Sequence, residues 1–94
     1  MTIVWKTMAI RDMQQIYAHI ASYAGAARGY EALADIHLRV NALADHPGLG
    51  RVGRKPGTRF IIVTRHGITY RATYRVRGQK VIILRIRDTR RQGA

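Results

Sequence analysis

The 94-residue chain contains no cysteine and only five acidic residues. The lack of cysteine excludes disulfides, thiol nucleophiles and cysteine-based zinc sites. Its four histidines (His19, His37, His46 and His66) do not have the spacing of metal ligands, so we expect no metal and no cofactor. No apolar run approaches the roughly 20 residues that span a bilayer, and the N-terminus lacks a secretory signal pattern. We therefore expect a cytoplasmic protein with no membrane contact, built as a single domain over residues 1–94.

The shortage of acidic residues is concentrated in the second half of the chain. Residues 1–46 contain four basic and four acidic residues, whereas residues 47–94 contain thirteen basic residues and only Asp88. The whole net charge of +12 thus comes from the second half. Fourteen of the 17 basic residues are arginines, whose planar guanidinium pairs with phosphate or carboxylate in a bidentate manner. The composition predicts an anionic partner.

The first half predicts one strand and two helices. The short β-branched segment Thr2–Trp5 is typical of a strand, and Thr7 is a candidate helix N-cap. Apolar residues then recur every three or four positions, which predicts two amphipathic helices joined by the small residues 24–29. The two apolar stripes are Ala9, Met13, Ile16, Ile20 and Tyr23, and then Leu33, Ile36, Val40 and Leu43. In this pattern Asp12 faces away from the core, and the helices form an antiparallel hairpin.

The second half predicts a glycine-rich loop over residues 47–58 and three further strands. The strands are Arg59–Thr64, Ile68–Val76 and Lys80–Arg87, and the short breaks between them are typical of hairpins. In the middle strand the apolar residues alternate with polar ones, and in the last strand we expect Ile82, Leu84 and Ile86 to face inward. The prediction is an α+β fold, in which an N-terminal strand precedes an antiparallel α-hairpin packed on an antiparallel β-sheet.

The free face of this sheet is expected to be rich in arginine. Like charges that lie opposite one another on neighbouring strands are destabilising, so an uncompensated basic face favours anion binding. The predicted anion- or target-binding residues are Arg59, Arg71, Arg75, Arg85, Arg87, Arg90 and Arg91.

The order and spacing of several short motifs resemble the ParE/RelE superfamily of bacterial type II toxin–antitoxin modules. These motifs cover nearly the whole chain, although no single one is specific. They are Trp5 with Ala9, Asp12, Ile16 and Ile20; Pro47, Gly50-Arg51, Gly53-Arg54 and Pro56-Gly57-Thr58-Arg59; Tyr70-Arg71 and Tyr74-Arg75-Val76; and residues 81–86 with Arg90-Arg91-Gln92. The resemblance implies a toxin that is ParE-like or RelE-like.

The two kinds of toxin differ in target and chemistry. ParE-like members poison DNA gyrase and block replication, whereas RelE-like members are ribosome-dependent mRNA interferases that cleave mRNA through 2′-hydroxyl attack. In the second case the resemblance assigns catalytic roles to Arg71 and Arg90, with Arg91 as an alternative to Arg90. The second strand has no lysine and the tail has no tyrosine, and arginine is a poor acid or base. We therefore favour the gyrase-directed hypothesis, and we note that a shifted alignment would bring His66 toward the site.

The resemblance also implies a cognate antitoxin as partner. We expect its segment to be acidic and amphipathic, to bind Arg71, Arg75 and Arg85 through carboxylates, and to bind Ile16 and Ile20 through apolar side chains. Neutralisation would then occlude the basic face. A simple nucleic-acid-binding module remains an alternative from another class, and it predicts salt-sensitive DNA binding without toxicity.

Overall fold

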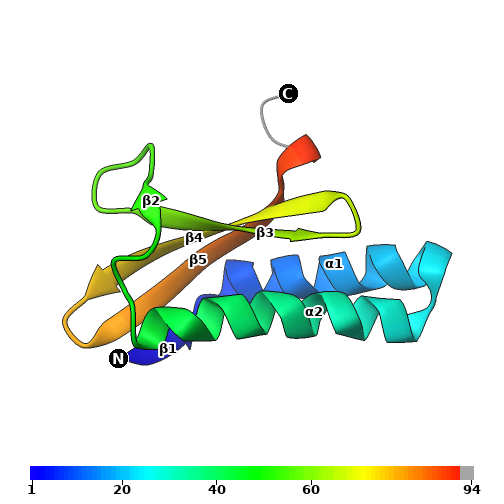
Figure 1. The fold of residues 1–94 in the computed structure, drawn as a ribbon, viewed down its shortest axis with the longest axis horizontal. Coiled ribbons are helices and arrows are strands. Elements are labelled where there is room, and N and C mark those ends of the chain that lie inside the picture. The colour runs from blue at the N-terminus through cyan, green and yellow to red at the C-terminus, as the bar shows by residue number, and fades with distance from the viewer. Residues whose placement is uncertain (92–94) are drawn as a thin grey trace.

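A computed structural model describes residues 1–91 of the chain. Two helices cover one face of a five-stranded sheet, and the other face carries no helix (Figure 1). The strands are β1 (Thr2–Trp5), β2 (Arg51–Val52), β3 (Arg59–Arg65), β4 (Ile68–Arg77) and β5 (Lys80–Asp88). The helices are α1 (Thr7–Ala24) and α2 (Ala26–Asn41), with short 3₁₀ turns at Ala42–Ala44 and Thr89–Arg91. The predicted α+β class is confirmed, and the predicted order of elements is right apart from the additional short strand β2.

The sheet is mixed rather than purely antiparallel. Its strand order is β1-β5-β4-β3-β2, and β1 pairs in parallel with β5, with Thr2 opposite Lys80 and Trp5 opposite Ile83. A parallel pair needs a long connection between its two strands, and the α-hairpin with β2, β3 and β4 provides one between β1 and β5. The antiparallel prediction is therefore right for β2 to β5 and wrong for β1.

The α-hairpin is tighter than its sequence predicts. The small-residue segment 24–29 was expected to form the turn, but Gly25 alone breaks the two helices, at φ 91°. Gly29 lies inside α2 with its backbone against Tyr17, where an added Cβ would come within 2.8 Å of the Tyr17 ring. At the start of α1 the N-cap is Lys6 rather than Thr7, and no side chain makes a capping hydrogen bond.

The core lies between the α-hairpin and the inner face of β3, β4 and β5. Most of the predicted apolar stripes lie in it, with Val40, Leu43 and Ile36 almost fully buried from the helical side and Tyr74 from the sheet. Tyr23 departs from the prediction, because its side chain is 60% exposed at the far end of α1.

A register shift in β5 changes which of its residues face the core. Val81 and Ile83 are buried, Ile86 is buried again, and Ile82 and Leu84 are not. The pairing of β4 with β5 passes from Thr73–Arg85 to Tyr74–Ile83, so Leu84 is the extra residue of a β-bulge. The expectation that Ile82 and Leu84 face inward is therefore wrong, because strict alternation holds only in an unbulged strand.

No helix in the described part of the chain is both long and apolar enough to cross a membrane. Among residues 1–91, no group of histidine and acidic side chains is placed to hold a metal ion.

Candidate functional site

A basic hollow lies on the sheet face that the helices leave open. It has a volume of about 370 Å³, and we call it the arginine groove. The groove is lined by Gly53, Arg54, Lys55, Thr58, Phe60, Arg71, Thr73, Arg75, Leu84, Arg85 and Arg87. No carboxylate, imidazole or phenol belongs to this set of described residues.

Alternation along β4 places Arg71, Thr73 and Arg75 on the open face, because Tyr70, Ala72 and Tyr74 are buried on the other. The bulge at Leu84 then returns Arg85 and Arg87 of β5 to the same face. Arg71 consequently lies directly opposite Arg87 in the β4–β5 register. Two like charges in this position repel each other, so the arrangement is unfavourable unless an anion neutralises it.

Arg71 is held at the centre of the groove. Its guanidinium carbon lies 4.3 Å from the centre of the Phe60 ring, a cation–π contact with the neighbouring strand β3. The Nε atom of Arg71 is buried and has no hydrogen-bond partner among the described residues. A buried donor without an acceptor costs about 1–3 kcal/mol. Arg71 is thus held by Phe60 while its Nε–H still lacks an acceptor among the described residues.

The loop before β3 forms one wall of the groove, and a buried tyrosine fixes it. The Tyr74 hydroxyl donates to the Pro47 carbonyl oxygen at 2.7 Å and accepts from the Gly50 N–H at 2.8 Å. Gly50 is required there, because an added Cβ would lie 2.6 Å from the Tyr74 hydroxyl oxygen. Within this loop, Thr58 donates to the Lys55 carbonyl oxygen, which stabilises the turn that carries Arg54 and Lys55. The residues Arg51–Val52 form the short strand β2, where the sequence predicted only loop.

Three of the predicted anion-binding arginines are already engaged. Arg59 donates from Nη1 to the Gly50 carbonyl oxygen at 2.8 Å, and so braces the loop. Arg90 makes two side-chain hydrogen bonds to Asp88, and hydrogen bonding to this carboxylate is the main cause that raises the pKa of Arg90. Arg90 does not line the groove with Arg71, so the two candidate catalytic residues are not brought together in it.

Arg85, the third, is bound to a buried carboxylate of α1. Its Nε and Nη2 atoms donate to Asp12 Oδ2 and Oδ1 at 2.8 Å and 3.1 Å, and these hydrogen bonds raise the pKa of Arg85. The Ile86 N–H also donates to Asp12 Oδ2 at 2.9 Å. Asp12 thus satisfies one backbone N–H of β5 beyond Ile83, where the pairing with β1 ends.

The prediction that Asp12 faces away from the core is therefore wrong, since it is only 7% exposed. The sequence did contain a signal, because Asp12 lies three residues after Ala9 and four before Ile16, on the inward stripe.

A second ion-pair cluster was also missed at sequence level. Arg65, at the end of β3, donates to Asp35 and, at 2.9 Å, to Glu31 of α2. The bond to Asp35 is the main reason why the pKa of Arg65 is raised. Glu31 and Asp35 are four residues apart, which places both on one helix face, but only the fold shows that Arg65 comes to meet them.

Other predicted anion-binding arginines have no acidic partner within the described part of the chain. Arg75 and Arg87, like Arg71, have no ion pair among the described residues, and the same holds for Arg54 and Lys55 in the loop. The side chain of Arg91 lies outside the described part of the structure.

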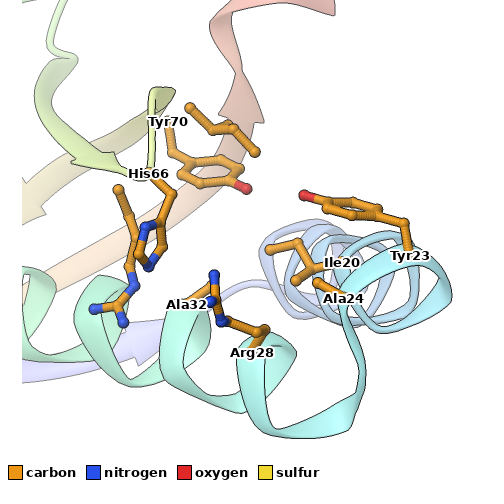
Figure 2. Close-up of a pocket in the computed structure, with 9 residues that line it drawn as sticks. Ile20, Tyr23, Ala24, Arg28, Ala32, His66 and Tyr70 are labelled. Carbon is orange, nitrogen blue, oxygen red and sulfur yellow. The ribbon is translucent and has the colours of Figure 1, made fainter.

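A small apolar cavity of about 130 Å³ lies at the far end of the molecule, between the β3–β4 turn and the α-hairpin. Figure 2 shows Tyr23 and Tyr70 on either side of it, with Ile20 between them and His66 at the sheet side. His66 has a φ of 49° in the tight turn, and it does not line the arginine groove.

Ile16 and Ile20, which were predicted to bind an antitoxin, are largely buried within the fold of this chain. Ile20 is 6% exposed and contributes one wall of the cavity, while Ile16 is half-buried against the core.

Comparison with known proteins adds a family to this geometry. The family model described as the ParE toxin of the type II toxin–antitoxin system parDE matches residues 3–93. A solved structure, described as the chromosomal ParDE toxin–antitoxin system from P. aeruginosa, is similar to this chain with a TM-score of 0.81 and 31% sequence identity. The similarity covers 94% of this chain and 95% of that one. Comparison with curated protein sequences gave no match.

Proposed function

Because the chain belongs to the ParE toxin family of type II toxin–antitoxin systems, we propose that it acts on DNA gyrase and blocks replication, and that a cognate antitoxin neutralises it. The observation that carries this proposal, beyond family membership, is the composition of the arginine groove. Its cations are suited to bind and orient an anion, and its lining residues include no carboxylate, imidazole or phenol to move a proton. Such a surface is suited to binding rather than to catalysis.

The same observation weighs against the mRNA interferase alternative. Cleavage by the 2′-hydroxyl needs a base, an acid and cations around the pentavalent phosphate. Arg71 is placed to supply a cation, but Arg90 is bound to Asp88 outside the groove. The groove is therefore better suited to holding a phosphate or a carboxylate than to cleaving RNA.

The antitoxin proposal rests on charge and on the apolar cavity. Carboxylates of an acidic antitoxin segment would pair with Arg71 and Arg75, which have no acidic partner of their own among the described residues. Arg85 would contribute less than the sequence predicted, because Asp12 already holds it. An apolar antitoxin side chain would enter the cavity beside Tyr23 and Ile20, since a dry cavity of about 150 Å³ accommodates a group the size of benzene.

Pulse-labelling of induced cells tests the target. Thymidine and amino-acid incorporation are followed over the first minutes after the toxin is expressed without its antitoxin. We expect thymidine incorporation to fall first, with broken chromosomal DNA. An early fall in amino-acid incorporation with intact DNA would instead identify a translation inhibitor and refute the gyrase proposal.

A purified system makes the same test direct. The toxin is expected to inhibit supercoiling by gyrase and to accumulate cleaved plasmid, with a quinolone as positive control. Preincubation with the cognate antitoxin should abolish both effects. If gyrase is unaffected at saturating toxin while cells expressing the same protein die, the proposed target is wrong.

A further inference from the structure

We propose that the arginine groove binds a phosphodiester group, so that this toxin contacts DNA as well as protein in the complex it inhibits. The biological setting of this inference rests on the proposed action on gyrase. The binding itself is a property of the isolated chain and can be measured without gyrase.

The first support is the imbalance of charge inside the groove. Five of its basic side chains have no ion pair among residues 1–91: Arg54, Lys55, Arg71, Arg75 and Arg87. The acidic side chains that form ion pairs do so with Arg85, Arg65 and Arg90, so none of them neutralises these five. The groove is thus a concentrated positive site rather than one side of an internal ion-pair network.

The second support is the convergence of two guanidinium groups. Arg71 and Arg87 are direct partners across the β4–β5 register, where side chains on one face lie close enough to contact the same ligand. Stacking of Arg71 on Phe60 fixes the orientation of its planar fork before any ligand arrives. An anion between the two arginines would remove their mutual repulsion and accept hydrogen bonds from two strands at once.

The chemistry of the lining favours a nucleic-acid backbone as the ligand of the toxin without its antitoxin, and antitoxin carboxylates on Arg71 and Arg75 would compete with it. A peptide segment usually anchors through an apolar side chain in a pocket, whereas a phosphate backbone needs cations and small polar donors. Around the arginines the groove presents Thr58, Thr73 and glycine-containing backbone. Its apolar side chains are Leu84 and Phe60, and the Phe60 ring is already in contact with Arg71. The apolar cavity suited to a peptide anchor lies elsewhere, beside Tyr23.

The experiment uses the full chain and a short fluorescein-labelled DNA duplex. Affinity is measured by fluorescence anisotropy between about 50 and 200 mM salt, and the slope of log K against log[salt] is determined. The double variant Arg71→Gln/Arg87→Gln removes both arginines that would hold the phosphate. Loss of one neutralised phosphate reduces the magnitude of the slope by about 0.9, which corresponds to a roughly tenfold weaker affinity near 0.1 M salt.

The matched control is Arg11→Gln/Arg39→Gln. It removes the same two charges from exposed positions in α1 and α2, which cover the other face of the sheet and do not line the groove. We expect the control to weaken binding by less than about threefold, because distant exposed charges are screened at this salt. If Arg71→Gln/Arg87→Gln does not fold, as judged by circular dichroism, Arg54→Gln/Lys55→Gln replaces it, since both side chains are exposed on the loop wall.

Several outcomes would overturn the inference. Equal losses in the groove variant and the control would show diffuse attraction without a site. No DNA binding at the lowest salt would exclude a phosphodiester ligand. Loss of antitoxin binding with unchanged DNA binding in the groove variant would identify the groove as a peptide site.

The inference and the proposed target fail in different ways. Groove-dependent DNA binding without any effect on gyrase would refute the target and leave the groove assignment standing. The groove variant could instead inhibit gyrase fully and bind DNA as tightly as the unsubstituted protein. That result would refute the groove assignment and leave the target standing.

Discussion

Asp12 offers the sharpest test of how this small domain is held together. Its carboxylate is 7% exposed and accepts hydrogen bonds from Arg85 Nε, Arg85 Nη2 and the Ile86 N–H. The substitution Asp12→Asn keeps the size of the side chain but removes its charge and turns one acceptor into a donor. That donor then faces either a guanidinium or a backbone N–H, so at least one buried hydrogen bond is lost.

The magnitude follows from the burial of the two partners. Removing one member of a fully buried pair costs about 3–5 kcal/mol, but the Arg85 side chain is 35% exposed and can be partly solvated. We therefore expect Asp12→Asn to lower the free energy of unfolding by about 2–3 kcal/mol. For a domain of this size each 1 kcal/mol shifts Tm by roughly 4–8 °C, so the expected fall in Tm is about 10–20 °C.

The assay is urea unfolding followed by circular dichroism, supported by thermal melts. Asp45→Asn is the matched control, because it makes the same chemical change at an exposed position and should alter stability by less than about 0.5 kcal/mol. A double-mutant cycle with Arg85→Gln isolates the pair, and a coupling free energy above about 0.5 kcal/mol is expected. If Asp12→Asn were as stable as Asp45→Asn, the buried pair would not stabilise the fold and the reasoning would be refuted.

Three further predictions concern the loop and the β3–β4 turn. Gly50→Ala places a Cβ 2.6 Å from the Tyr74 hydroxyl oxygen and should cost about 1–3 kcal/mol in urea unfolding. Gly48→Ala, whose added Cβ has nothing within 4 Å, is the control and should be nearly neutral. Equal costs would contradict the close approach of Gly50 to Tyr74. Tyr74→Phe leaves the buried Gly50 N–H without an acceptor and should cost about 1–3 kcal/mol, with faster amide hydrogen exchange at Gly50. Unchanged exchange at Gly50 would contradict the hydrogen bond between its N–H and the Tyr74 hydroxyl. Arg65→Gln removes two partly exposed ion pairs and should lower the urea midpoint only slightly, with faster hydrogen exchange confined to the β3–β4 turn. The exposed Arg77→Gln is the control, and a global loss of protection would contradict a local role.

Much of the fold could be predicted because it depends on local periodicity. A step of three or four residues places Ile36 and Val40 on one helix face, and a step of two places Tyr70 and Tyr74 on one sheet face. These patterns identify two elements that must cover each other, so the helix-on-sheet architecture follows from burial of apolar surface alone. The basic second half likewise predicted a positively charged open face, because no acidic residues alternate with its arginines.

The details of that face depended on contacts between residues far apart in the sequence. The bulge at Leu84 overturned the simple alternation of β5, and no local pattern marks a bulge whose cause is the pairing with β4. The same limit applies to charge. The sequence showed seven candidate arginines, but it could not show that Arg85 is engaged by Asp12, which is 73 positions away.

By itself, the sequence determined the class of elements, the apolar stripes, the excess of positive charge and the resemblance to toxin families. The first three depend on residue types and on spacings of four residues or fewer, and the resemblance depends on the order of short motifs along the chain. Only the tertiary structure decided that β1 lies parallel to β5, that Asp12 reaches Arg85 across 73 positions, and that Arg71 stands opposite Arg87. The physical reason is that the interaction energy of two charges depends on their distance in space. The packing of the chain therefore decides which arginines are paired with a carboxylate and which can bind a ligand.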